Sequence, residues 1–326
     1  MKNVNLVLGT MTFGESVFAP EVTDFLNAFL DAGYTELDTA YVYNDGVCET
    51  LLGDALAALD RPYQIATKVN PRITGRLDAE AAYLQLNESL QRLRLPCVDT
   101  LYLHFPDPAT PVESVLSACG ELHARGKFKE LGLSNFPAWM VADVYYICEK
   151  NGWVKPTVYE GIYNPLTRKA ETELNACLDR FGMRFYAYNP LAGGLLTGRY
   201  GSFEAAPEDG RFTHRPNYQK RYWKKSYFDA VEVIKAAAEQ NGVSLIDAVY
   251  RWMAYHSMLN GERGDAILIG ASKLSHLRQN MASLQEGPLP EEVVAAFEEA
   301  WQVCRADSPE YFTLYRGKGS VGGEKK

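Results

Sequence analysis

The sequence predicts an α/β protein. We expect a closed (β/α)8 TIM barrel formed as a single domain by residues 1–326, with a long loop after strand 7 and an extra C-terminal helix and tail. Two observations favour this fold. Short apolar runs alternate with segments whose apolar residues recur at helical spacing, which is typical of a parallel sheet. Eight such strand-helix units fit a closed barrel, and an open doubly wound sheet is the alternative.

The expected strands are short apolar or alternating runs separated by helical periodicity. In chain order they cover residues 4–11, 34–40, 63–70, 98–106, 129–135, 156–164, 183–190 and 265–272. The expected helices cover residues 19–33, 49–59, 78–95, 111–127, 137–152, 170–182, 227–242, 245–257, 273–284 and 289–304. The third helix opens on Asp78, a favourable N-cap because its carboxylate can accept from a free backbone N–H group.

One segment breaks the alternation. Residues 191–225 are rich in Gly, Pro, Arg and aromatic residues and show little periodicity. Loops of this length are usually functional or disordered, and we expect one or the other here.

The composition argues against several classes of function. A net charge of −8 and a pI near 5.3 disfavour non-specific nucleic-acid binding, which needs a basic surface. No apolar run reaches the ~18 residues of a membrane span, and the N-terminal segment is too short and mixed for a signal peptide. The six cysteines form no C-x-x-C pair or zinc spacing. We therefore expect a cytoplasmic protein without disulfides, bound metal or a membrane partner.

Polar residues stand at the ends of several expected strands, where barrels of this kind place their active sites. Asp38 ends the second strand, Tyr43 follows it, Lys68 lies in the third strand and His104 in the fourth. An ammonium beside a phenol lowers the phenol's pKa from about 10, and a carboxylate would hold that lysine charged. A histidine could hydrogen-bond a carbonyl oxygen. The four residues together predict a general acid with a polarising partner.

Each residue also has a purely structural interpretation: a turn aspartate, a packing tyrosine or a core histidine. The lysine is harder to explain in this way, because lysine is rarely buried unpaired. The chain has no G-x-S-x-G elbow and no H-E-x-x-H motif, so nothing indicates a serine nucleophile or a zinc protease.

At these residues the chain resembles the aldo-keto reductase family. The matching stretches follow the family's order: GYTELDTAYVYNDGVCETLLGDAL, IATKVN, VDTLYLHFPD, ELGLSNF, YAYNPLAGGLLTGRY and LRQN. LHFPD and NPLAGGLLTG resemble the branch of aflatoxin-aldehyde and succinic semialdehyde reductases. The resemblance implies an NADPH-dependent reductase that converts aldehydes and some ketones to alcohols.

The resemblance also implies a mechanism. Asp38 would hold Lys68, Lys68 would acidify Tyr43, and Tyr43 would protonate the carbonyl oxygen while hydride arrives from the nicotinamide and His104 orients the carbonyl. A nucleotide-binding regulatory subunit on the same fold is the first rival, and the complete set of four residues disfavours it. A barrel hydrolase or metal enzyme is the second, and the lack of His/Asp clusters at the strand ends disfavours it.

Cofactor positions follow from the same resemblance. Ser134 and Asn135 would bind the nicotinamide carboxamide, and Tyr188 would stack on the ring. The other implied contacts are the pyrophosphate-loop residues Asn189, Leu191, Gly193 and Leu195, then Arg211 in the long loop, and Asn280 at the adenine.

The chain departs from the family pattern at two places. Glu160 stands where the family has a glutamine that contacts the nicotinamide carboxamide, and an ionised carboxylate can only accept hydrogen bonds. The resemblance therefore still implies a cofactor contact, in which Glu160 accepts from the carboxamide NH₂. The usual cations for the 2′-phosphate are absent, and Ser272, Lys273 and Arg278 are the nearest replacements. Two of these are cationic, which favours NADPH over NADH.

The expected substrate pocket is aromatic and apolar, which suits aryl or alkyl aldehydes. Its candidate residues are Met11, Tyr41, Phe105, Tyr222, Trp223 and Phe312. Branch members that act on acidic aldehydes carry an arginine where this chain has Thr313, and here Arg316 follows three residues on. A carboxylate-bearing substrate therefore stays open. Dimers are common in the branch, so the resemblance allows a homodimer.

Overall fold

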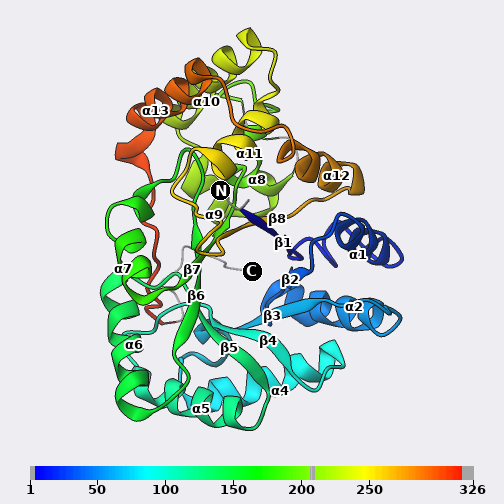
Figure 1. Ribbon diagram of the computed structural model, residues 1–326, viewed down its shortest axis with the longest axis vertical. Helices are drawn as coiled ribbons and strands as arrows, with labels where there is room; N and C mark the ends of the chain where they lie inside the picture. Colours follow the sequence, from blue (N-terminus) through cyan, green and yellow to red (C-terminus); the bar gives the residue numbers. More distant parts are fainter. Residues whose placement is uncertain (1–3, 206, 208–209, 318–326) are drawn as a thin grey trace.

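The computed structural model describes residues 4–205, 207 and 210–317. Its eight strands form a closed barrel in which each strand pairs in parallel with its neighbours in chain order, inside a ring of helices (Figure 1). The predicted (β/α)8 fold is confirmed, and the open doubly wound sheet is wrong.

All strands except β5 are shorter than the apolar runs that predicted them, because the last residues of those runs bend into the loops at the barrel mouth. They are β1 (Asn5–Gly9), β2 (Glu36–Asp38), β3 (Gln64–Val69), β4 (Val98–Leu103), β5 (Phe128–Ser134), β6 (Pro156–Ile162), β7 (Arg184–Tyr188) and β8 (Ala266–Ile269).

All ten expected helices are present. They are α1 (Glu21–Asp31), α2 (Val47–Leu56), α4 (Ala79–Leu93), α5 (Val112–Ala124), α6 (Ala138–Asn151), α7 (Leu174–Phe181), α10 (Lys225–Gln240), α11 (Leu245–Tyr255), α12 (Leu274–Ser283) and α13 (Glu291–Cys304). Asp78 caps α4 as predicted, since its Oδ1 accepts from the Ala81 N–H at 3.0 Å. Short helices that the periodicity did not predict are α3 (Pro71–Thr74) and the 3-10 turns η1 (Tyr43–Gly46), η2 (Lys169–Glu171) and η4 (Arg305–Asp307).

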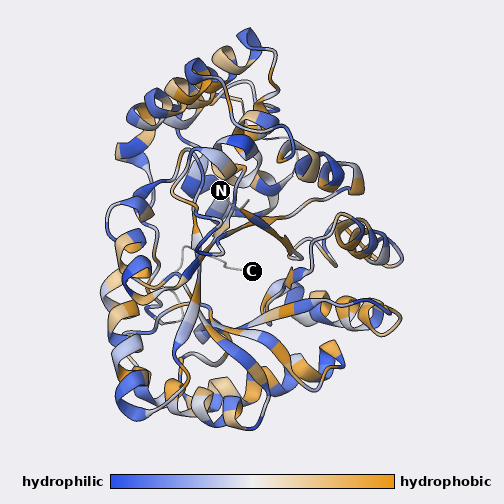
Figure 2. Cartoon of the chain, viewed as in Figure 1, coloured by the Kyte–Doolittle hydropathy of each residue, from blue (hydrophilic) through white to orange (hydrophobic). Residues whose placement is uncertain are grey.

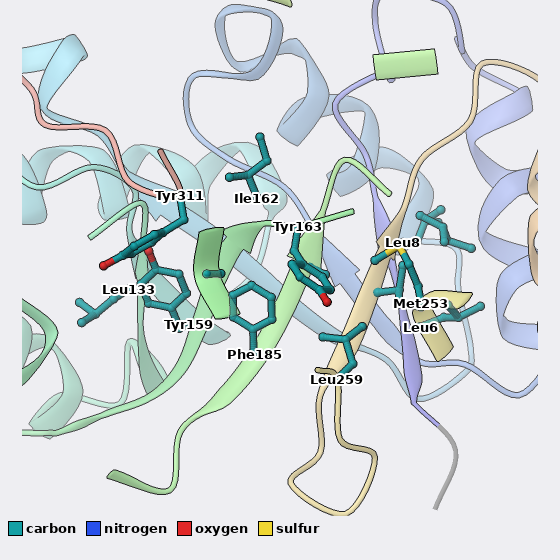
Figure 3. Packing of buried hydrophobic residues seen from close by; sticks show 14 of the residues in the cluster. Leu6, Leu8, Leu133, Tyr159, Ile162, Tyr163, Phe185, Met253, Leu259 and Tyr311 are labelled. Atoms are coloured by element: carbon teal, nitrogen blue, oxygen red, sulfur yellow. The ribbon is translucent and has the colours of Figure 1, made fainter. Parts of the chain in front are cut away.

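Alternation along the strands divides the side chains between two cores. Leu6 and Leu8 of β1 point outward, and Figure 3 shows them near Met253 of α11. Val7 points inward and belongs to a separate core inside the barrel, together with Tyr102 and Tyr186. Because residues two apart share a face, the same rule turns polar residues near the strand ends into the barrel mouth. Along the outer helices, hydrophobic and hydrophilic residues alternate (Figure 2).

The described part of residues 191–225 contains regular structure at both of its ends. They form the 3-10 turn η3 (Ala192–Thr197) and the short helices α8 (Arg211–His214) and α9 (Pro216–Tyr222). Aromatic rings hold this segment together: Trp223 lies within 5.3 Å of Tyr200 and 5.1 Å of Phe212, centroid to centroid. Sequence periodicity missed these helices because each is too short to repeat an apolar face.

The extra C-terminal helix α13 packs against α10 at one edge of the ring (Figure 1). The tail then crosses to the barrel mouth, where the Thr313 N–H donates to the Asn135 carbonyl at 3.1 Å and the Tyr315 N–H to the Pro106 carbonyl at 2.9 Å. All six cysteines are free thiols. Among the described residues, no helix is both long and apolar enough to cross a membrane.

Candidate active site

A buried ion cluster lies at the carboxyl ends of β2, β3 and β6. The Lys68 ammonium donates to the Asp38 carboxylate and to the Thr39 carbonyl at 3.0 Å, and its Nζ lies 3.1 Å from Glu160 Oε2. The three charged side chains are at most 4% exposed. Burial would lower the pKa of Lys68, but the two carboxyl groups outweigh it, so that pKa is raised.

Glu160 is the unusual member of this cluster. Burial first, and then the negative charge of Asp38, raise its pKa to about 8. Burial also raises the pKa of Asp38, against the opposing pull of Lys68. The raised pKa of Glu160 favours a cluster of one ammonium, one carboxylate and one protonated carboxylic acid, which avoids an excess buried negative charge.

Tyr43 opens η1, directly above this cluster. Asn44 and Asp45 adopt left-handed backbone conformations, and the Asn44 amide donates to the carbonyls of Met11 and Phe13 at 3.0 and 2.8 Å. These contacts tie the β1 loop to η1 and fix where the tyrosine enters the mouth. Lys68 Nζ lies 5.6 Å from the centroid of the Tyr43 ring.

The expected lowering of the Tyr43 pKa is wrong for this structure. Burial first, and then the charges of Asp38 and Glu160, hold the pKa of Tyr43 well above its ordinary value. The phenol therefore keeps its proton at neutral pH. The Lys68 ammonium can stabilise a phenolate only once Tyr43 has given up that proton.

His104 follows β4, and its ring centroid lies 6.2 Å from that of Tyr43. Burial, and then the positive charges of Lys68 and Arg72, lower its pKa well below the usual value, so the ring is neutral. Phe105 stacks on it at 4.8 Å between centroids and carries the Arg72 guanidinium on its ring at 4.1 Å. No sequence pattern singled out Arg72.

The predicted carboxamide residues meet in one network. The Asn135 amide donates to the His104 carbonyl and to Ser134 Oγ, both at 3.0 Å, and its oxygen accepts from the Tyr188 hydroxyl at 2.7 Å. Asn135, directly after β5, and Asn189, directly after β7, both have φ near +60°. The network thus joins the ends of β4, β5 and β7 into one rigid rim.

The glycine-rich turn after β7 is built for close approach to its neighbours. A Cβ on Gly193, whose φ is +71°, would lie 2.8 Å from the Tyr218 ring. Arg211 lies over the same ring at 5.1 Å, and Tyr218 in turn donates to Asn189 Oδ1 at 3.2 Å. Leu195 is buried within the turn. The Asn189 amide nitrogen is buried and has no hydrogen-bond partner among the described residues.

Two cations near this turn were missed by sequence reasoning. Arg221 lies 5.7 and 5.8 Å from the rings of Tyr218 and Tyr222. Arg215 pairs with Glu15 of the β1 loop at 2.8 Å, closing η3, α8 and α9 against the other side of the mouth. Only the fold reveals this pair, because the two residues are 200 positions apart in the sequence.

The candidate residues for the 2′-phosphate lie at the start of α12 or directly before it. Ser272, Lys273 and Arg278 are exposed, whereas Asn280 is buried. Exposed cations here are compatible with a phosphate contact and equally with a solvated helix face, so these assignments stay predictions.

The predicted pocket walls divide into two groups. Met11, Phe105 and Phe312 are half-buried around the mouth. Tyr41 instead donates to Glu88 of α4 at 2.5 Å and lies under the Arg92 guanidinium. Tyr222 is fully buried, and Trp223 belongs to the aromatic cluster of residues 191–225. Arg316 is exposed near the chain's end.

Within the described part of the chain, no three His, Cys, Asp or Glu residues are grouped so that they could hold a metal ion. The barrel mouth instead contains a protonated phenol, a neutral imidazole and a lysine held by carboxyl groups. This fold and site have the architecture that the resemblance implies for a barrel oxidoreductase.

Comparison with known proteins identifies the family. Residues 5–302 match the model of the aldo/keto reductase family, and the chain belongs to that family. It is 46% identical over 318 residues to human aflatoxin B1 aldehyde reductase member 2, which covers 94% of this chain and 89% of the relative. Human aldo-keto reductase family 7 member A3 is also 46% identical, over 94% of this chain and 96% of its own. The aldo-keto reductase pigE of Monascus ruber is 33% identical over 90% of each. The branch inferred from LHFPD and NPLAGGLLTG is confirmed.

Proposed function

We propose that this protein is an NADPH-dependent reductase of aldehydes and some ketones. The observation that carries the proposal is the arrangement of Asp38, Lys68, Tyr43 and His104: a protonated phenol above a buried ammonium, with a neutral imidazole beside it. The human relative named aflatoxin B1 aldehyde reductase member 2 supports an aldehyde substrate.

The chain's own residues supply the proton and stabilise charge. A carbonyl oxygen placed between Tyr43 and His104 would accept a hydrogen bond from each, which polarises the carbonyl. A reduced nicotinamide, when bound, supplies the hydride to the carbonyl carbon. Tyr43 gives its proton to the oxygen as negative charge develops there. Lys68 then stabilises the phenolate, and Asp38 keeps Lys68 charged.

The residues at the mouth fit a dinucleotide. The Asn189 amide nitrogen is a buried donor without a protein partner, and the backbone around Gly193 leaves no room for a side chain. Glycine there lets backbone N–H groups approach a pyrophosphate, and Arg211 adds a positive charge. Ser134, Asn135 and Tyr188 would hold the nicotinamide end. Leu191 and Leu195 would shape the turn.

The other end of the dinucleotide would lie toward α12, with Asn280 at the adenine and Ser272, Lys273 and Arg278 at the 2′-phosphate. For the substrate we retain Met11, Phe105 and Phe312 as the wall, which suits an aryl or alkyl aldehyde.

A direct assay tests the proposal. Purified protein should oxidise NADPH, followed by absorbance, only when 4-nitrobenzaldehyde is present. Tyr43→Phe should lower kcat at least about 100-fold, the usual contribution of general acid catalysis, while NADPH quenches protein fluorescence as before. Binding of NADPH without turnover would support the regulatory subunit instead. If Tyr43→Phe kept more than about a tenth of the activity, the proton donor would lie elsewhere.

A further inference from the structure

Asn70 is fully buried directly after β3, and three contacts fix its position. Its Oδ1 accepts from the Arg72 N–H at 3.0 Å, which caps α3. Its backbone N–H donates to Gln85 Oε1 at 2.9 Å, and its carbonyl accepts from Gln85 Nε2 at 3.0 Å. Gln85 is a fully buried residue of α4. Backbone and side chain of Asn70 are therefore both held.

The free end of this amide faces the imidazole. Asn70 Nδ2 lies 3.2 Å from His104 Nδ1. The amide cannot be turned over, because its NH₂ group would then meet the Arg72 N–H, donor against donor, and its oxygen would be lost as the cap. The group facing Nδ1 is consequently a donor, and Nδ1 must accept.

We propose that Asn70 is a positioning residue that selects the tautomer of His104 in which Nε2 carries the proton, with Gln85 holding Asn70 in place. This inference rests on the proposed function for its catalytic consequence. In a neutral imidazole one nitrogen donates and the other accepts. With Nδ1 committed to Asn70, the Nε2–H is the group left to polarise a carbonyl.

The same contact also opposes the doubly protonated ring. An imidazolium would bring an Nδ1–H against the Asn70 NH₂. The charged groups near the ring, Lys68 from β3 and Arg72 from α3, act in the same direction, and the neighbouring Tyr43 and Phe105 carry no charge. His104 thus polarises the carbonyl as a neutral donor, which leaves proton transfer to Tyr43.

The chain offers a nearly isosteric test. Asn70→Asp keeps the cap, since aspartate accepts from the Arg72 N–H as well as asparagine does. It replaces only the NH₂ group facing Nδ1 by an acceptor. Nδ1 must then carry a proton, so His104 becomes either the opposite tautomer or an imidazolium.

The readout is the ¹⁵N spectrum of protein labelled at histidine, which contains five histidines, with the His104 signals assigned by their loss in His104→Gln. In the unchanged protein Nε2 should be the protonated nitrogen and Nδ1 the bare one. In Asn70→Asp, Nδ1 should be protonated. Where Nε2 is bare, kcat should fall about 100-fold, the usual cost of losing one such donor, with a smaller change in KM. An imidazolium keeps the Nε2–H and should lose less activity.

Asn164→Asp is the matched control. Asn164 is also fully buried, its Oδ1 caps the Leu166 N–H at 3.0 Å, and its NH₂ donates to a backbone carbonyl rather than a histidine. It should leave the His104 signals unchanged. If Asn70→Asp does not fold, Asn70→Ser keeps a capping oxygen but cannot reach Nδ1, and His104 should become a mixture of tautomers.

A proton on Nδ1 in the unchanged protein, or an unchanged His104 spectrum in a folded Asn70 variant, would overturn the proposal. A changed tautomer with undiminished reduction would leave Asn70 as the positioning residue and would instead refute the catalytic role of His104. The positioning role of Asn70 and the catalytic role of His104 can therefore be refuted independently.

Discussion

At the scale of single residues, burial decides which groups of the site are charged. Tyr43 and Glu160 keep their protons and His104 stays neutral, because a low-dielectric site penalises the charged form of each. Lys68 stays charged despite its burial, because two carboxyl groups lie against it. Glu160, at the position where the resemblance implies a glutamine, thus gives the site a carboxyl group whose pKa is raised to about 8.

That group links stability to pH. The folded pKa of Glu160, about 8, lies above the ordinary value of 4.5, so the folded chain binds the extra proton between these values. Stability from this group is complete below about pH 4.5 and is lost as pH rises to about 8, by at most about 1.4 kcal/mol per pH unit. Glu160→Gln removes the loss.

Urea unfolding at pH 5, 6.5 and 8 would measure this pH-dependent loss of stability. The free energy of unfolding of Glu160→Gln, minus that of the unchanged protein, should increase with pH. A difference that stays constant, or that shrinks with rising pH, would mean that Glu160 is ionised throughout this range.

Glu160 also offers Lys68 a second counter-ion. In Asp38→Asn, burial still raises the Glu160 pKa, but the further rise caused by the Asp38 charge is gone, so Glu160 ionises more readily and can hold the ammonium. In the double variant with Glu160→Gln no carboxylate remains beside Lys68. Burial should then lower the Lys68 pKa until the amine is neutral.

We therefore expect Asp38→Asn and Glu160→Gln each to reduce kcat modestly, and the pair to reduce it at least about tenfold more than the product of the two. The double-variant cycle on kcat, with folding checked by circular dichroism, measures this coupling. Additive effects would show that Glu160 does not support Lys68.

At the scale of elements, close approach of α2 and α4 brings Glu49 and Arg92 together at 2.8 Å. A Cβ on Gly53 of α2 would lie 2.2 Å from the Arg92 carbonyl oxygen and 3.0 Å from the Leu93 Cα. Both are backbone atoms, so the helices would have to separate.

Gly53→Ala should accordingly destabilise the protein by about 1–3 kcal/mol. Helix propensity alone predicts the opposite sign, a gain of about 1 kcal/mol. Chemical unfolding decides between them. Gly201→Ala, where nothing lies within 4 Å of the added carbon, should be near neutral. A stabilised Gly53→Ala protein would show that α2 moves away easily.

Sequence periodicity was sufficient to predict the eight strands and their main helices, and strand ends were sufficient to find Asp38, Lys68 and His104. It could not find Asn70, whose role depends on β3 and β4 lying side by side, or the Arg215–Glu15 pair. Nor could it give the sign of the Tyr43 pKa shift, because the depth of burial and the distance to Glu160 are properties of the folded chain.

At the scale of the whole molecule, charge is unevenly placed. The chain carries a net charge of −8, yet residues 211–225, which lie over the barrel mouth, are cationic. The cations of this segment are Arg211, Arg215, Lys220, Arg221, Lys224 and Lys225. A multiply anionic nucleotide is attracted to such a region despite the overall negative charge, since local potential governs its approach.

Nucleotide binding should also stabilise the fold as a whole. A ligand at 100 times its Kd adds about 2.7 kcal/mol, which for a chain of this length raises Tm by about 4 °C. Charge-assisted contacts to a phosphate contribute roughly 1.5–3 kcal/mol, at least about tenfold in affinity. NADPH should therefore raise Tm more than NADH at the same concentration.

The double change Lys273→Ala with Arg278→Ala isolates the 2′-phosphate. It should lower the Tm increase with NADPH by about 2 °C or more and leave the increase with NADH unchanged, because NADH has no phosphate to lose. Arg125→Ala with Lys150→Ala removes the same charge from other exposed surface and should change neither. Equal losses for both nucleotides would mean that these cations support the fold or the pyrophosphate. If NADPH kept its full advantage, the phosphate would bind elsewhere, and the cationic segment from Arg211 to Lys225 would be the next place to mutate.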